Sequence, residues 1–301
     1  MKRIIALALC VIFVLSLVGC NAEKEDDGKI SIVVTAFPHY DFARQLTKNV
    51  ENVEIKMLVS PGNEVHSYEP SPSDILAISS CDVFIYTGGE SETWVDGILS
   101  SAGNDGMKVV SFMEALHLEH DHDSLESDEH VWTRPDFVLH LSDSIKTALV
   151  EKDEKNSAQY IKNAEEFSND IVDIILEFDD IRSNMTRNEI IVADRFPFYH
   201  LAKAFEFGYD SAYPGCSHST EPSAQTISEL AKKVRDENIK YVFTIEFSNG
   251  KIAKSVTEGT DAEILTLHSC HNVSKEDFEK GITYYDLMMQ NAANLRKALC
   301  E

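Results

Sequence analysis

One long segment in the middle of the chain limits what it can fold into. Residues 156–185 contain neither glycine nor proline. Apolar residues recur there every three or four positions, which is the period of an α-helix with one buried face. They are Ile161, Ala164, Phe167, Ile171, Ile174, Ile175, Phe178 and Ile181. We therefore expect one helix of about thirty residues, on the order of 45 Å long, that acts as a rigid spine.

Strand and helix patterns alternate on both sides of this segment. Short runs rich in β-branched residues read as strands at 30–37, 53–59, 82–87 and 108–112, and again at 189–193, 240–245 and 262–267. Strands that alternate with helices favour parallel sheets covered by helices. We predict an α/β protein with an N-terminal lobe at 30–152, a linking helix at 153–186 and a C-terminal lobe at 187–301.

The first residues resemble a targeting segment and not part of the fold. Lys2 and Arg3 precede an apolar run at 4–18, which has the shape of a secretory signal peptide. Its end, LVGC at 17–20, resembles the lipobox of bacterial lipoproteins. We therefore expect a signal peptide at 1–19, a lipid on Cys20 and a polar tether at 20–29. The lipid would anchor the protein to the cell membrane outside the cytoplasm.

Composition narrows the classes of partner. The formal net charge of −24 over 301 residues argues against nucleic acid. The cysteines show no CxxC or other metal-binding spacing. Cys216 and Cys270 both fall in loops of the second half, and they could pair in an oxidising compartment.

An acidic, histidine-rich stretch interrupts the first half at 117–130. It contains almost nothing apolar, so we expect a solvated loop. His117, His120 and His122 form either a weak accessory metal site or a chance feature of this insertion. His130 differs from them, because Val131 and Trp132 follow it directly.

Four polar residues share one place in the expected fold, at or just beyond a strand end or at the start of a helix. They are His66, His130, Asp194 and His268. Strand ends of two α/β lobes can converge on the cleft between them. Three imidazoles and a carboxylate suit Zn²⁺ and are acceptable to Mn²⁺ or Fe²⁺. Spacing alone does not establish that the four meet.

Three motifs carry a resemblance to a known family. PGNEVHSYEPSPSD at 61–74 is similar to a PGxDPHxYEPTPxD loop, DEHVWTRPD at 128–136 to a DPHxWLDP segment, and SHSTEPSAQTISEL at 217–230 to an SxxxEPSxxxL segment. Together they resemble the metal-specific solute-binding lipoproteins of ABC importers, the zinc and manganese receptors. The resemblance spans the mature chain. It implies two lobes joined by one long helix, with the metal in the cleft.

The resemblance also suggests which residues bind the ion. His66 and His130 carry over as ligands from the N-terminal lobe. The C-terminal lobe departs from the family pattern, because Asp194 stands where a third His or a Glu is usual and His268 where Asp or Glu is usual. A shifted comparison brings in His200 in place of Asp194. Glu246 is an alternative ligand or a hydrogen-bonding neighbour of the ligands.

Several further residues have weaker claims. His39 follows Pro38 at a strand–helix junction and could line the cleft, and Glu221 is another alternative acid. His218 and His271 lie close to the expected site in sequence, but they stay outside the predicted ligand set.

The leading functional hypothesis is a monomeric receptor that captures a divalent metal and delivers it to the transmembrane subunits of an ABC permease. Three histidines favour Zn²⁺ over Mn²⁺. The alternatives are a manganese or iron receptor of the same type and, from other classes, an extracytoplasmic metallohydrolase or an adhesin. The chain has neither HExxH nor GxSxG, so we predict that it is not an enzyme.

Overall fold

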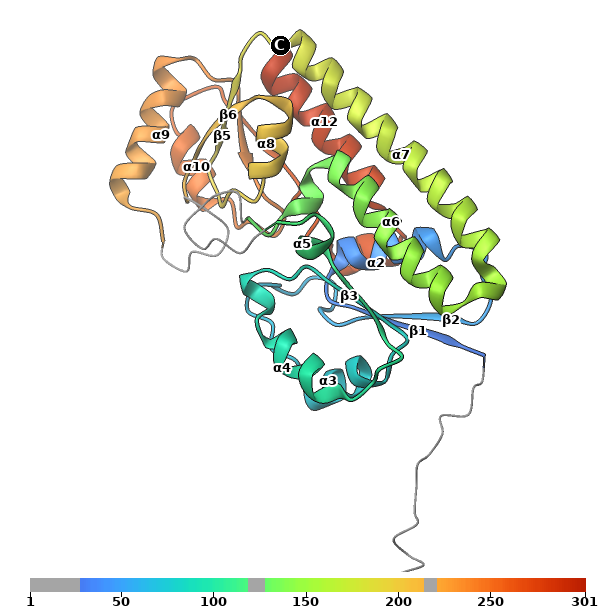
Figure 1. The fold of residues 1–301 in the computed structure, drawn as a ribbon. Coiled ribbons are helices and arrows are strands. Elements are labelled where there is room, and N and C mark those ends of the chain that lie inside the picture. The colour runs from blue at the N-terminus through green and yellow to red at the C-terminus, as the bar shows by residue number, and fades with distance from the viewer. Residues whose placement is uncertain (1–27, 119–127, 214–220) are drawn as a thin grey trace, which may run out of the picture.

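The computed structural model describes residues 28–118, 128–213 and 221–301. They form two α/β lobes that lie along one long helix (Figure 1). This helix, α7 (Ser157–Asn184), spans 28 residues and confirms the predicted spine. The segments expected to carry the signal peptide and the lipid lie outside the described residues. Among the residues that are described, no helix is both long and apolar enough to cross a membrane.

The N-terminal lobe contains a four-stranded sheet of order β2-β1-β3-β4, in which all neighbours are parallel. The strands are β1 (Ile30–Val34), β2 (Val53–Met57), β3 (Val83–Tyr86) and β4 (Lys108–Ser111). The helices are α2 (Phe37–Leu46), α3 (Pro72–Ser80), α4 (Trp94–Ala102), α5 (Phe112–Ala115) and α6 (Pro135–Lys152). Short 3₁₀ turns lie at Glu90–Glu92, Val131–Thr133 and Glu154–Asn156.

The C-terminal lobe repeats this plan with a parallel sheet of order β6-β5-β7-β8. Its strands are β5 (Glu189–Val192), β6 (Gly208–Ser211), β7 (Tyr241–Thr244) and β8 (Glu263–Thr266). Its helices are α8 (Tyr199–Phe205), α9 (Ala224–Asp236), α10 (Lys251–Thr257), α11 (Lys275–Glu279) and α12 (Tyr284–Cys300). Strand β6 was not predicted; it is a short strand at the edge of the sheet with no buried residue.

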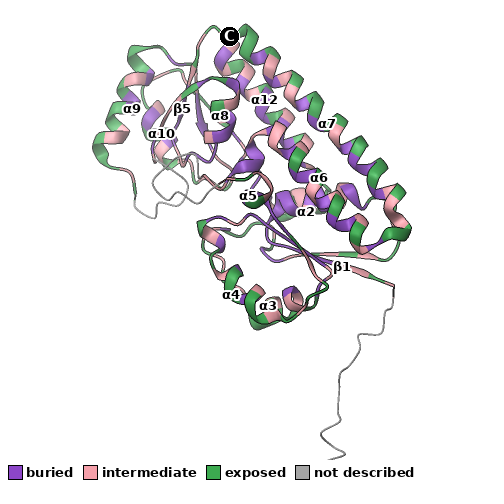
Figure 2. Ribbon diagram, in the orientation of Figure 1, coloured by how far each residue is buried: buried purple, intermediate pink, exposed green. Residues whose placement is uncertain are grey.

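The spine is held by packing along one of its faces. Helices α6 and α12 pack against α7, and α12 runs beside it between the two lobes (Figure 1). Phe167, Ile171 and Phe178 on that face are at most 3% exposed, and Figure 2 shows the alternation of buried and exposed turns along α7. The predicted stripe differs from the structure at two positions, because Ile161 is 45% exposed and Ile175 is only half-buried.

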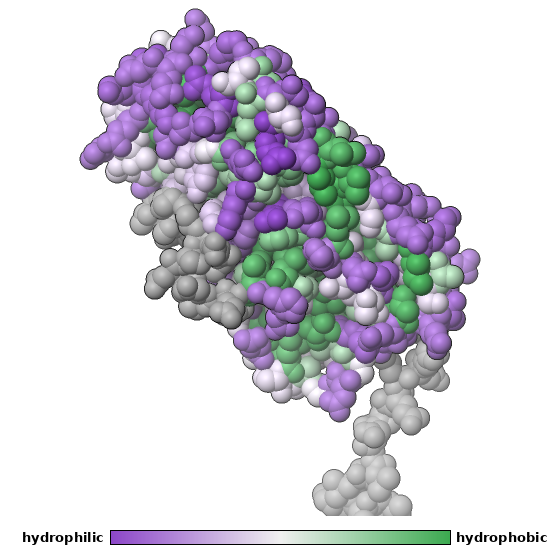
Figure 3. All heavy atoms as spheres, turned by 45° about the horizontal axis from the view of Figure 1, so that its top comes forward, coloured by the Kyte–Doolittle hydropathy of each residue, from purple (hydrophilic) through white to green (hydrophobic). Residues whose placement is uncertain are grey.

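The surface agrees with the acidic, water-facing character of the sequence. Polar residues cover most of the face in Figure 3, with separate hydrophobic patches between them. The strands of each sheet are parallel, so their carboxyl ends lie at one edge, which is where α/β folds bind ligands. The loops that leave these ends carry the residues of the site.

Candidate metal centre

Three histidines come together where the two lobes meet. His66, His130 and His271 each offer one ring nitrogen, and these three atoms lie within 4.8 Å of one another. The ring centroids are 5.5 Å apart for His66 and His130, 4.9 Å for His66 and His271, and 5.1 Å for His130 and His271. It is the one group of three or more His, Cys, Asp or Glu in the described part of the chain that could hold a metal ion.

His66 lies in the loop between β2 and α3. Its neighbour Val65 is 7% exposed and packs with Val59 and Ala36, which fixes the loop on the N-terminal sheet. The loop ends at α3, where Ser71 accepts a hydrogen bond from the backbone of Asp74 and Asp74 in turn accepts from Ser71. This capping box sets the start of the helix at Pro72.

Residues before and after His130 in the sequence hold it in place. Val131 and Trp132 are fully buried and anchor the chain that follows. The Nδ1–H of His130 donates to Oδ1 of Asp128 at 3.0 Å. A proton held on Nδ1 leaves the Nε2 lone pair for a metal ion, an arrangement common among metal-binding histidines. His200 supports the same turn by donating from Nε2 to the carbonyl of Asp128 at 2.7 Å.

His271 comes from the loop after β8 in the C-terminal lobe. Glu246, just beyond the end of β7, accepts hydrogen bonds from the backbone N–H and the hydroxyl of Ser269. The Ser269 hydroxyl accepts from the N–H of His271 at 3.2 Å. Cys270 between them has a left-handed φ of 59°, which turns the chain sharply. Glu246 therefore positions the His271 backbone, and it lies outside the group of donor atoms.

Hydrogen bonds across the lobe junction fix His271 relative to the other two histidines. Trp132 Nε1 donates to the carbonyl of Ser269 at 2.8 Å. Asn272, which is 2% exposed, donates to the carbonyls of Ser60 at 3.0 Å and Asn63 at 2.9 Å in the His66 loop. The His271 segment thus contacts the N-terminal lobe directly, although it belongs to the C-terminal half of the chain.

The structure brings together two of the four predicted ligands, His66 and His130, and places the other two elsewhere. His268 is turned to its own loop, because its Nδ1 accepts from the N–H of Cys270 at 2.9 Å. The sharp turn at Cys270 directs His271 into the group in its place. Asp194 accepts from the Ser248 hydroxyl and from the Arg195 N–H, so its carboxylate is held within the C-terminal lobe.

The alternative residues also have other surroundings. His39 is fully buried, and its ring nitrogens contact the hydroxyls of Thr35 and Thr87. Glu221 is exposed and accepts from the Tyr213 hydroxyl. His117 is exposed, whereas His120, His122, His218 and Cys216 lie outside the described residues. Cys270 has a free, fully buried thiol.

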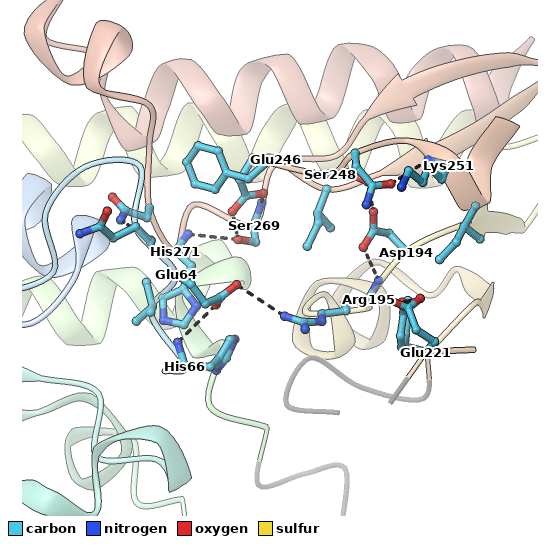
Figure 4. Close-up of a pocket in the computed structure, with 18 residues that line it drawn as sticks. Glu64, His66, Asp194, Arg195, Glu221, Glu246, Ser248, Lys251, Ser269 and His271 are labelled. Atoms are coloured by element: carbon cyan, nitrogen blue, oxygen red, sulfur yellow. Dashed lines mark hydrogen bonds and ion pairs between the residues drawn. The ribbon is translucent and has the colours of Figure 1, made fainter. Parts of the chain in front are cut away.

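A polar pocket opens beside the histidines. It has a volume of about 370 Å³, and its lining includes His66, His271, Asp194 and Arg195. In Figure 4 His66 and His271 lie on one side of the pocket and Asp194 on the other. Arg195 crosses between them and lies 3.6 Å from Glu64 of the N-terminal lobe. The pocket gives the histidines a route to solvent.

Burial keeps His271 in the neutral form that binds metal ions. Burial, followed by the neighbouring imidazoles of His130 and His66, holds the pKa of His271 well below its usual 6.5. Burial acts to raise the pKa of Asp128, but the charge and hydrogen bonds of His130 lower it overall. The neutral imidazole of His271 therefore provides a lone pair for a cation at neutral pH.

One residue near the group was missed from the sequence. Glu129 Oε1 lies 3.2 Å from His66 Nδ1, and the Glu129 side chain is 11% exposed. Glu129 stands where the similar family segment, DPHxWLDP, has proline. That departure is the sequence signal for Glu129, but one more acid is inconspicuous in a stretch that is acidic throughout.

Known proteins that are similar to this chain are named for zinc uptake and zinc binding. The family described as zinc-uptake complex component A, periplasmic, matches residues 32–298. The high-affinity zinc uptake system protein ZnuA of Bacillus subtilis is 28% identical over 293 residues, covering 93% of this chain and 90% of that protein. The zinc-binding lipoprotein AdcA of Streptococcus pneumoniae is also 28% identical, but the chain spans 61% of its length.

Solved structures have the same fold. The metal-dependent lipoprotein YcdH from Bacillus subtilis superposes with a TM-score of 0.79 at 27% identity, over 91% of this chain and all of that one. The Zn(II)-bound ZnuA-like domain of Streptococcus pneumoniae AdcA gives 0.77 at 23% identity, over 91% of this chain and all of that domain, which supports the fold alone. Because the family match covers both lobes and the helix between them, the chain belongs to the family of periplasmic A components of zinc-uptake complexes.

Proposed function

We propose that the protein is an extracytoplasmic receptor that captures a divalent transition metal ion, Zn²⁺ first of all, between its lobes. It binds the ion through His66, His130 and His271. One observation carries this proposal: three imidazoles from loops far apart in sequence present nitrogens within 4.8 Å of one another. Two of the three rings are at most 7% exposed.

The chemistry of the donors favours zinc. Imidazole is a borderline-soft ligand that suits Zn²⁺, whereas Mn²⁺ prefers oxygen ligands. The names of the relatives, a zinc uptake protein and a zinc-binding lipoprotein, support the same choice. Mn²⁺ is bound more weakly at the same site.

The bound ion is cargo and not a catalyst. The receptor passes it to the transmembrane subunits of an ABC permease, as expected of a component of an uptake complex. A lipid on Cys20 and the tether at 20–29 hold the monomer at the outer face of the cell membrane. The lobes at 30–152 and 187–301, joined by the helix at 153–186, enclose the ion.

The test is a competitive titration of Zn²⁺ and Mn²⁺ against the purified protein and four single alanine variants. We expect tight Zn²⁺ binding by the parent and near-complete loss in His66→Ala, His130→Ala and His271→Ala. His268→Ala is the matched control, since it removes an imidazole three residues from His271 that points to its own loop. We expect it to lose far less Zn²⁺ affinity than His271→Ala, because it removes a hydrogen-bond acceptor of the Cys270 N–H and no ligand of the ion.

Two outcomes would contradict the proposal. One is a parent protein that takes up no Zn²⁺ at micromolar supply. The other is the reverse order of the two C-terminal variants, with binding lost in His268→Ala and kept in His271→Ala. Preference for Mn²⁺ over Zn²⁺ would support the manganese receptor instead.

A further inference from the structure

The proposed site is one donor short. Zn²⁺ held in a closed protein site is nearly always four-coordinate and tetrahedral, and the histidine group supplies three neutral nitrogens. His130 and His271 are 2% and 7% exposed. A divalent cation in such surroundings is costly without a negative charge beside it. A carboxylate is therefore the expected fourth donor.

Most carboxylates near the pocket are engaged elsewhere. Both oxygens of Glu246 accept from Ser269. Asp194 is held by Ser248 and the Arg195 N–H. Glu64 accepts from the backbone of His66 at 3.3 Å and faces Arg195. Using any of these as a ligand would dismantle an interaction that shapes the pocket.

Glu129 is placed differently, because one of its oxygens faces the histidines. Its Oε1 is 3.2 Å from Nδ1 of His66, and it precedes His130 in the chain. Two ligands on one tetrahedral ion, at metal–ligand distances of about 2.0–2.1 Å, lie about 3.3 Å apart. The contact between Glu129 and His66 is an ion pair, and its length equals the separation of two donors on one tetrahedral ion.

The other oxygen of Glu129 is anchored. Oε2 accepts from the backbone N–H of Ser91 at 3.2 Å and from its hydroxyl at 2.9 Å. A Cβ on Gly89 would collide with the Glu129 side chain, so glycine there makes room for it. Ligating carboxylates are typically hydrogen-bonded in this way through the oxygen that does not bind the metal.

We propose that Glu129 is the fourth ligand of the metal ion, binding through Oε1 while Ser91 holds Oε2. This rests on the proposed receptor function and names a ligand within that same site. Glu129 is not within 4.8 Å of all three imidazole donors, so the ion draws its carboxylate inward as it binds. The donor set becomes three imidazoles and one carboxylate, with the carboxylate supplied by the N-terminal lobe.

The experiment uses the purified protein loaded with Co²⁺, whose visible absorption reports its ligands, and titrates the complex with azide. If Glu129 occupies the fourth position, azide leaves the spectrum of the parent unchanged. In Glu129→Ala a water takes the vacated position, as in open metal sites. Azide then replaces that water and produces a saturable spectral change. Zn²⁺ affinity should fall by at least about 100-fold in Glu129→Ala, the upper end for loss of a partner of a ligand.

Glu64→Gln is the matched control. It also neutralises a carboxylate beside His66, but one that contacts the backbone and not the ring. We expect its Co²⁺ spectrum to resemble that of the parent and to stay indifferent to azide. Ser91→Ala, which removes one hydrogen bond from Oε2, should weaken Zn²⁺ binding by roughly 10-fold and leave the spectrum unchanged. Thermal unfolding of each variant checks that it folds.

The results separate this inference from the receptor function. A parent that binds Zn²⁺ tightly but responds to azide as Glu129→Ala does would show that water, not Glu129, is the fourth ligand. Equal Zn²⁺ affinity in Glu129→Ala and Glu64→Gln would overturn the inference too. Failure of the parent to bind Zn²⁺ would instead refute the receptor function itself.

Discussion

Replacing Asn272 by alanine tests how the two lobes are held around the histidines. Its amide group donates to the carbonyls of Ser60 and Asn63, at 3.0 and 2.9 Å. Its Oδ1 accepts from the N–H of Val273 at 2.8 Å. The side chain is buried, and it joins the segment that carries His271 to the loop that carries His66. Alanine removes all three hydrogen bonds at once.

The size of the effect follows from these contacts. A buried hydrogen bond contributes about 1 kcal/mol net, so three give about 3 kcal/mol of lost free energy of unfolding. When Zn²⁺ binds the variant, part of its binding free energy must be used to order the His66 loop again. That part is at most the same free energy that the three hydrogen bonds contributed. Since about 1.4 kcal/mol is a tenfold change in affinity, we expect Zn²⁺ binding by Asn272→Ala to weaken by roughly 10-fold to 100-fold.

Two measurements check this prediction. Urea unfolding of the metal-free protein gives the change in stability, and competitive Zn²⁺ titration gives the change in affinity. Asn249→Ala is the control, because Asn249 lines the same pocket but makes one local hydrogen bond, to the N–H of Lys251 at 2.9 Å. We expect Asn249→Ala to cost about 1 kcal/mol or less and to leave affinity nearly unchanged.

An Asn272→Ala variant that unfolds at the same urea concentration as the parent and binds Zn²⁺ equally well would contradict this prediction. The junction would then be held by other contacts, such as that of Trp132 with Ser269. A loss of stability without a loss of Zn²⁺ affinity would show that the hydrogen bonds of Asn272 do not support the metal site.

Two further predictions concern the fold around the site. Burial raises the pKa of Glu92 from its ordinary 4.5 to about 7, although the Thr87 and Gly88 N–H groups donate to it. A raised pKa means that the contribution of Glu92 to stability is present below about pH 4.5 and is lost as pH rises through 7. Glu92→Gln, measured by urea unfolding, should therefore match the parent near pH 4 and exceed it by about 3 kcal/mol at pH 8; equal stabilities at pH 8 would contradict this. Phe178→Ala on α7, which removes a ring 4.9 Å from that of Phe205 on α8, should lower the free energy of unfolding by about 3–5 kcal/mol, and a loss below about 1 kcal/mol would refute the packing described for the spine.

Long-range periodic patterns allowed most of the fold to be predicted. The α7 helix could be predicted because its apolar period persists over 28 residues without a helix breaker. The strands with buried residues, such as Val83–Tyr86, could be predicted from their β-branched and aromatic runs. β6 was missed because its sequence, GYDS, contains no β-branched residue.

The site was harder to predict because its geometry depends on turns and tertiary contacts. His66 and His130 lie in motifs with a recognisable pattern, so the sequence pointed to them. The choice between His268 and His271 depends on the left-handed turn at Cys270 and on the Glu246–Ser269 contact, neither of which has a sequence signature. Glu129 lies beside His66 because Gly89 and Ser91, nearly forty residues earlier, leave room for its side chain and hydrogen-bond to it.

The position of the ion itself tests most directly whether His66, His130 and His271 bind it. Crystals of the Zn²⁺-loaded protein, measured at wavelengths on either side of the zinc absorption edge, locate the metal by its anomalous scattering. We expect one strong peak bonded to the imidazoles of His66, His130 and His271 at about 2.0–2.1 Å. A peak bonded to Asp194 or His268, with His271 out of reach, would contradict it.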